Sequence, residues 1–261
     1  MRYVIRAAGG IACLVGFSLL ALVLTAPGTW SGVGYASALS LLSIALPSAM
    51  ANAYQRMHES EGDVPSPVLA TYAGMQTPSE HDDIEIGDAA GTGGAVVFLH
   101  GFAGSFTLPC WEISRAAARA HLATVCPATG WRGDWWSAEG ERIVRATIAS
   151  LRARGVAHLY LAGLSNGGVG VSRLAPRLPG TLRGVIVISG AAPEAPNPGV
   201  PLLVIQGRND AMMPAAVARD YAERSAGRYV ELDAGHFAML LRAKEARDAM
   251  VPWLTQREAA R

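Results

Sequence analysis

Cysteine and net charge are both scarce in this chain. Its 261 residues include three cysteines, and the formal net charge is +1. The cysteines show no metal-ligand spacing and are too few for a disulfide framework. Charged residues make up only 16% of the chain and nearly balance, so we expect no nucleic-acid partner. The sequence also has no repeat of fixed period. We therefore expect neither a metal nor a cofactor. A chain of 261 residues can form one large domain or two small ones.

Charge is absent from most of the first 54 residues. After Arg2 and Arg6, residues 7–26 and 33–51 form two uncharged runs, each of about 20 residues and long enough to cross a bilayer as a helix. One interpretation is a helical hairpin, residues 7–51, that anchors the protein in the cell membrane. The rival interpretation is a long signal sequence cleaved near Ala51 or Ala53, which would export the protein. We favour the retained anchor, and the side of the membrane that the remaining chain faces stays open.

Composition divides the rest of the chain at residue 94. Residues 55–94 are polar and rich in proline, glycine and acids, which is typical of a linker with room for one or two edge strands. From residue 95 to residue 261, apolar runs alternate with helical patterns. Strands are expected over 95–100, 122–127, 157–163, 183–189, 200–207 and 227–233, and helices over 111–121, 137–155, 166–176, 215–225 and 239–254. This alternation predicts an α/β domain with a mostly parallel sheet and helices on both faces.

Three chemically complementary residues follow three of these strands. Ser165 lies in "GLSNGG" after the run 157–163, Asp210 follows 200–207, and His236 follows 227–233. A G-x-S-x-G pattern alone is weak in a chain with 29 glycines. Parallel strands, however, bring their carboxyl ends to one edge of the sheet. There a histidine can accept the serine proton while a carboxylate orients the imidazole.

Four blocks in this order resemble the α/β-hydrolase superfamily over residues 95–254: "FLHGFAGS", "GLSNGG", "GRNDAMMP" and "AGHF". The resemblance implies a nucleophile at Ser165, a base at His236 and an acid at Asp210. It also implies an oxyanion hole from the backbone N–H groups of Phe102 and Asn166, and a bracing role for His100. Many relatives carry Met or Gln at position 166, and the antiparallel edge of the family's sheet is poorly marked in this sequence.

Other residues near the predicted strand ends have two interpretations each. Asp233 is a second candidate for the acid, although it lies only three residues before His236, so Asp210 is preferred. Trp131, Trp135 and Trp136 either cover the end of the sheet or line a substrate entrance. Cys110 and Cys126 should lie near the same edge, either as a disulfide or as two buried thiols.

The connection between the strands 183–189 and 200–207 is too short for the helical cap that larger relatives insert there. We therefore expect an open cleft and a serine hydrolase that cleaves carboxylic esters, like a carboxylesterase or lipase, through an acyl-enzyme. Small-molecule or lipid-like esters fit this expectation. A peptidase or thioesterase of the same fold is the alternative within the class. A membrane-tethered binding module without catalysis is the alternative outside it.

Overall fold

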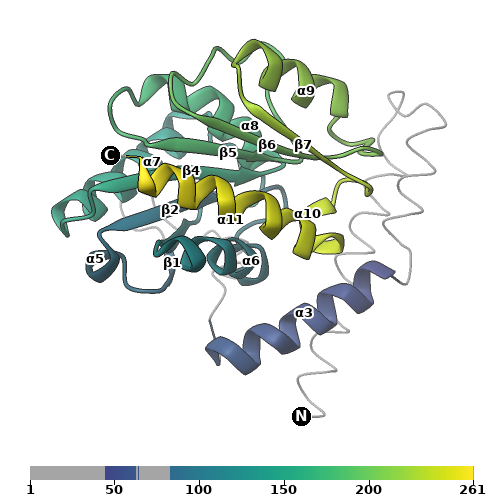
Figure 1. Ribbon diagram of the computed structural model, residues 1–261, viewed down its shortest axis with the longest axis horizontal. Coiled ribbons are helices and arrows are strands. Elements are labelled where there is room, and N and C mark those ends of the chain that lie inside the picture. The colour runs from purple at the N-terminus through teal and green to yellow at the C-terminus, as the bar shows by residue number, and fades with distance from the viewer. Residues whose placement is uncertain (1–44, 63, 65–82, 261) are drawn as a thin grey trace. The chain divides into compact units, whose positions relative to one another are not determined.

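The computed structural model describes residues 45–62, 64 and 83–260 (Figure 1). The chain divides into two compact units, Met1–Gly62 and Asp63–Arg261. The described part of the first unit is the helix α3 (Ala45–Glu61) with Gly62. The second unit contains the sheet and every other described helix and strand. The candidate functional residues from position 100 onward all lie in this second unit.

Helix α3 occupies part of the segment in which the sequence predicts a membrane anchor. The first predicted span, 7–26, lies outside the described residues, as does most of the second, 33–51. The residues of the second span from Ala45 onward begin α3, which continues through the polar sequence as far as Glu61. Residues 55–61, expected in the linker, are therefore helical. Within the described ranges, no helix is both long enough and apolar enough to cross a membrane.

A single seven-stranded sheet organises the second unit, in the order β1-β3-β2-β4-β5-β6-β7. The edge strand β1 pairs antiparallel with β3, and all other neighbours are parallel. The strands are β1 (Asp83–Ile86), β2 (Gly94–Leu99), β3 (Ala123–Pro127), β4 (His158–Leu164), β5 (Gly184–Ile188), β6 (Leu202–Gly207) and β7 (Arg228–Leu232). The predicted mostly parallel sheet is confirmed, and its antiparallel edge lies late in the expected linker.

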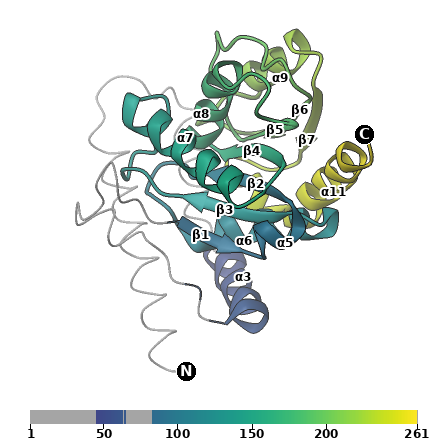
Figure 2. The same ribbon diagram turned by 90° about the vertical axis from the view of Figure 1, so that its left-hand side faces the viewer.

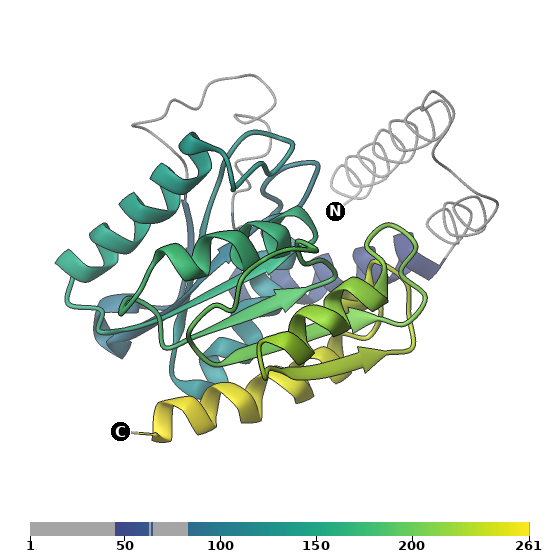
Figure 3. The ribbon, with the colours of Figure 1, turned by 90° about the horizontal axis from the view of Figure 1, so that it is seen from above.

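Helices cover both faces of this sheet, as Figures 2 and 3 show. Alternate residues of β2 point to opposite faces, so Val97 and Leu99 join one apolar core while Val96 and Phe98 join the other. The first core includes side chains of α7 (Ala138–Ala153), α8 (Asn166–Leu174) and α9 (Ala215–Arg224). The second includes side chains of α6 (Thr107–Ala117), α10 (Ala238–Leu241) and α11 (Ala243–Ala259). Two covered faces explain why the inner strands are continuous apolar runs.

The start of α7 carries a local signal in the sequence, whereas the last predicted helix differs from the prediction. Ser137 begins α7 by accepting a hydrogen bond from the N–H of Gly140, a standard N-cap. The sequence predicts one helix over 239–254. The structure instead has α10 and α11, because Arg242 between them has φ −121° and ψ 43°, outside the helical region. Helix α11 then passes through Pro252 and ends at Ala259. A short helix, α5 (Ala89–Thr92), precedes β2.

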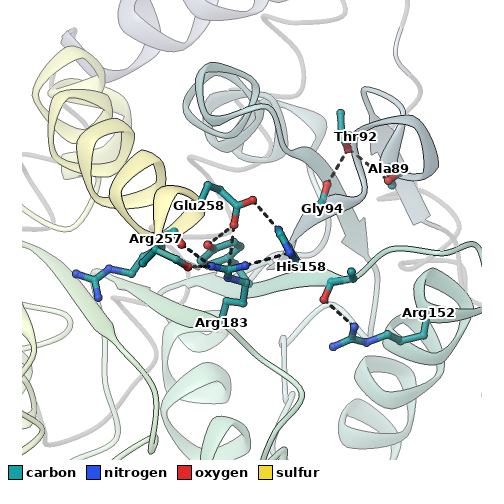
Figure 4. Close-up of polar contacts among 11 residues, drawn as sticks. Ala89, Thr92, Gly94, Arg152, His158, Arg183, Arg257 and Glu258 are labelled. Carbon is teal, nitrogen blue, oxygen red and sulfur yellow. Dashed lines mark hydrogen bonds and ion pairs between the residues drawn. The ribbon is translucent and has the colours of Figure 1, made fainter.

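A polar network fixes the end of α11 at the amino ends of β4 and β5 (Figure 4). His158 Nδ1 lies 2.8 Å from Glu258 Oε2, and Arg183 Nη1 lies 3.0 Å from His158 Nε2. Because Arg183 can only donate, His158 Nε2 must accept, which leaves the Nδ1 proton for Glu258. Arg183 also donates to the carbonyl oxygens of Arg257 and Ala260. Both nitrogens of His158 are thus engaged in holding the helix.

Two further features frame the carboxyl edge of the sheet. A disulfide joins Cys110, on α6, to Cys126, on β3. Strand β5 is followed by β6 with no intervening helix between Ile188 and Leu202. The connection therefore contains no helical cap, in line with the expectation from its length.

Candidate active site

Three side chains that follow three different strands meet by hydrogen bonds at the carboxyl edge of the sheet. Ser165 directly follows β4, Asp210 lies just beyond β6, and His236 lies just beyond β7. The distance from His236 Nε2 to Ser165 Oγ is 2.9 Å, and the distance from His236 Nδ1 to Asp210 Oδ2 is also 2.9 Å. All three residues are buried. The structure thus brings together the three residues selected from the sequence.

Ser165 sits on a strained turn between β4 and α8. Its φ is 56° and its ψ is −119°, a conformation that residues with side chains rarely adopt. The turn closes only because its glycines lack side chains. A Cβ atom on Gly163 would lie 2.3 Å from Gly167 O, and one on Gly167 would lie 2.0 Å from Leu99 O. The glycines therefore allow the backbone contacts that present the serine hydroxyl at the edge of the sheet.

The carboxylate of Asp210 accepts four hydrogen bonds. Oδ1 accepts from the N–H groups of Met212, at 3.0 Å, and Met213, at 2.9 Å. Oδ2 faces His236 Nδ1 and accepts from Gln206 Nε2 at 2.8 Å. All four neighbours can donate, so these hydrogen bonds suit an ionised Asp210 carboxylate. His236 then donates from Nδ1 and carries its proton on that nitrogen. The lone pair of His236 Nε2 is then directed at the hydroxyl of Ser165.

The other acid considered from the sequence takes no part in this arrangement. Asp233 is exposed, and its backbone carbonyl accepts from Arg242 Nε. Asp210 is the carboxylate that contacts His236. The short sequence distance between Asp233 and His236 leaves no loop long enough to turn that carboxylate back.

The loop after β2 lies against the serine. A Cβ atom added to Gly101 would lie 3.0 Å from Leu164 O and 3.1 Å from Ser165 Cβ, so the Gly101 backbone passes beside Ser165. The next N–H belongs to Phe102, one of the two predicted oxyanion donors. The other belongs to Asn166, the first residue of α8. Such an N–H has no partner inside its own helix, and the positive end of the helix dipole lies there.

The His100 side chain holds this loop by hydrogen bonds. Its Nε2 accepts from the N–H of Thr129 at 3.1 Å, so the ring proton is on Nδ1, 2.7 Å from Gly101 O. Trp135 Nε1 donates to the carbonyl oxygen of His100 at 2.8 Å. Burial lowers the pKa of His100 to about 4, which keeps the ring neutral. Gly101, Thr129 and Trp135 therefore hold His100 in place.

The three tryptophans have different environments. Trp135 is fully buried and packs edge-on against His100, so the interpretation of Trp135 as an entrance residue is wrong. Trp136 is half-buried, with the Arg173 guanidinium over its ring. Trp131 is 42% exposed and packs edge-on against Phe102, with ring centroids 4.9 Å apart. Only Trp131 presents a large exposed ring next to the loop after β2.

Two side chains at the site were missed by sequence reasoning. Gln206 contacts Asp210, and the detectable signal is a polar residue inside the buried run "LLVIQG". Met212 is exposed and lies beside Asp210, and nothing in the sequence indicates that it belongs to the site. Asn166, identified for its N–H, also uses its side chain, because Nδ2 donates to Arg132 O at 2.7 Å. In the described part of the chain, no group of three or more metal-ligating side chains is present.

Solved structures share this fold and have low sequence identity to the chain. An α/β hydrolase from the metagenome of lagoon sediments in Morocco has 16% identity and a TM-score of 0.55, covering 70% of this chain and 98% of its own. The chain has the α/β-hydrolase fold.

Two other solved structures share this α/β-hydrolase fold with the chain. Est1E from Butyrivibrio proteoclasticus, solved with bound ferulic acid, has 12% identity and a TM-score of 0.55, covering 69% of this chain and 96% of its own. A monoacylglycerol lipase from Paleococcus ferrophilus has 17% identity and a TM-score of 0.55, covering 68% and 99%. No family model and no curated protein sequence matches the chain.

Proposed function

We propose that this protein is a serine hydrolase that cleaves carboxylic esters through an acyl-enzyme. The observation that carries the proposal is the chain of two 2.9 Å contacts from Ser165 through His236 to Asp210. A serine hydroxyl is a poor nucleophile at neutral pH and needs a positioned base. This arrangement supplies the base, with Asp210 to stabilise the imidazolium that forms.

In the proposed reaction, Ser165 Oγ attacks the ester carbonyl while its proton passes to His236 Nε2. The N–H groups of Phe102 and Asn166 stabilise the oxyanion, and each such donor is worth about 3 kcal/mol in the transition state. The bond from carbon to the alcohol oxygen then breaks, and His236 returns the proton to the departing alcohol. Water, deprotonated by His236, hydrolyses the acyl-serine and restores the free hydroxyl.

Exposed apolar groups around the site favour esters with an apolar part. In the described ranges, the large hydrophobic side chains that are exposed are Phe102, Trp131 and Met212. Phe102 and Trp131 contact each other, and Met212 donates its N–H to Asp210. Phe102 thus lies on the loop after β2, Trp131 packs against it from the loop after β3, and Met212 lies in the turn that holds Asp210. An exposed aromatic pair such as Phe102 and Trp131, beside a proposed oxyanion donor, favours contact with an apolar part of the substrate.

The direct test is labelling by a fluorophosphonate probe, combined with burst release of p-nitrophenol from esters of graded chain length. We expect Ser165 to be labelled and Ser165→Ala to lose both signals. Ser150→Ala, on the exposed surface of α7, is the matched control and should retain them. Turnover of amides or thioesters in preference to all oxygen esters would instead establish a peptidase or thioesterase. An unlabelled Ser165 with no turnover would favour a binding module and overturn the proposal.

Attachment to the membrane through residues 7–51 remains a proposal that rests on the sequence. Its test is the intact mass of the mature protein together with its distribution between membrane and soluble fractions. A full-length chain recovered with the membrane would support the anchor. A chain that begins near residue 52 would support the cleaved signal sequence.

A further inference from the structure

Gln206 is a buried polar residue in an otherwise apolar strand. It lies on β6, where every residue is buried, and its own exposed fraction is 0%. Burying an amide away from water costs about 1–3 kcal/mol unless hydrogen bonds replace those to water. The hydrogen-bond partners of the amide therefore indicate why the strand carries a glutamine at this position instead of another leucine or valine.

Both amide protons of Gln206 are directed at the segment that carries Asp210. Nε2 lies 2.8 Å from Asp210 Oδ2 and 3.0 Å from Met213 O. Both partners only accept, so the opposite orientation of the amide would place Oε1 against two acceptors. Oε1 has no hydrogen-bond partner among the described residues. The side chain thus gives up one hydrogen bond while using both donors on the Asp210–Met213 turn.

The Gln206 bond ends on the same oxygen that faces His236. Asp210 Oδ2 is shared by Gln206 Nε2 and His236 Nδ1, whereas Oδ1 is held by two backbone N–H groups. A donor on Oδ2 acts in two ways. It fixes the direction of the oxygen toward the imidazole, and it spreads negative charge that would otherwise stabilise the imidazolium.

We propose that Gln206 is a positioning residue that orients Asp210 and limits how readily His236 takes up a proton. The inference rests on the proposed function, because His236 is taken as the general base. Since a base must be unprotonated to act, a donor on Oδ2 extends activity to lower pH. Gln206 itself does not contact Ser165 or the reacting atoms.

The experiment compares the wild-type protein with Gln206→Met, which keeps the length of the side chain but removes both donors. We expect kcat to fall about tenfold because Asp210 and His236 are less well oriented. We also expect the acid limb of the kcat/KM profile to move up by about half a pH unit. The control is Ile205→Val on the same strand, which lowers stability by a small core cavity and should leave the profile in place.

A purely structural role would lower the melting temperature of Gln206→Met without moving its pH profile. An unmoved acid limb in active, folded Gln206→Met therefore overturns the inference while the esterase proposal stands. Absence of turnover in the wild-type protein overturns the esterase proposal instead.

A second measurement needs neither catalysis nor a folded variant. In nuclear magnetic resonance spectra of the wild-type protein, the side-chain amide of Gln206 should shift with pH in step with the imidazole of His236. The internal reference is His158, which lies at the amino end of β4, away from the carboxyl ends of the strands, and whose Nε2 accepts from Arg183. We expect the Gln206 amide to follow His236 and not His158. An amide signal that does not change through the titration of His236 would contradict the interaction of Gln206 with His236 through Asp210.

Discussion

His100 holds the carbonyl oxygen of its neighbour Gly101 at 2.7 Å from Nδ1. That carbonyl belongs to the same peptide group as the N–H of Phe102. Because a peptide group is planar and trans, fixing the oxygen on one side fixes the direction of the N–H on the other. His100 therefore orients a proposed oxyanion donor without approaching the substrate.

Replacing His100 should slow catalysis more than it weakens substrate binding. His100→Leu removes the bond to Gly101, so we expect kcat on a p-nitrophenyl ester to fall about tenfold or more, with KM changed less. Steady-state kinetics at pH 7 measure both. The control is His121→Asn, an exposed position with φ 57° that asparagine tolerates. Equal losses of activity in the two variants would contradict the role of His100.

His100 should also make stability depend on pH. Its pKa is lowered to about 4 from 6.5, so the unfolded chain takes up a proton between these values while the folded chain does not. Stability therefore falls as the pH drops through this window, by about 2 kcal/mol at pH 5 relative to pH 7. Urea unfolding at both pH values measures the difference. His100→Asn should show a smaller pH dependence, and an unchanged one would refute the assignment.

Asn166 should tolerate loss of its side chain better than gain of a charge. Asn166→Ala keeps the backbone N–H and loses only the bond to Arg132 O, so we expect kcat to fall by about twofold to fivefold. Asn166→Asp is nearly the same size but places a carboxylate against that carbonyl and near the developing oxyanion. We expect about a hundredfold loss at pH 7. If both variants lose activity equally, the charge argument is wrong.

The disulfide between Cys110 and Cys126 should contribute measurably to stability. It closes a loop with a sequence separation of 16, for which chain entropy gives about 3 kcal/mol. We expect the Cys110→Ala/Cys126→Ala double variant to unfold at correspondingly lower urea. Reductant should destabilise the wild-type protein and leave the double variant unchanged. Free thiols found at both Cys110 and Cys126, by alkylation and mass spectrometry of the unreduced wild-type protein, would contradict the bond.

The sequence predicts the sheet well because burial on both faces requires continuous apolar runs, and glycine and polar residues end them. The three hydrogen-bonded residues could be selected for the same reason, since each follows such a run. The break at Arg242 had no signal, because residues on both sides of it have helical propensity. Trp135 and Trp131 look equivalent in "GWRGDWW", and only the fold determines that one packs under His100 while the other is exposed.

Some positions at the site can be redesigned and others cannot. The glycines around Ser165 are fixed by backbone contacts, whereas the side chains of Phe102, Trp131 and Met212 are exposed. Saturation libraries at positions 163 and 167 would yield almost only glycine, since any larger residue displaces main-chain atoms. Libraries at the three exposed positions would leave the hydroxyl and imidazole undisturbed. Directed evolution toward new acyl or alcohol groups should therefore begin at those three positions.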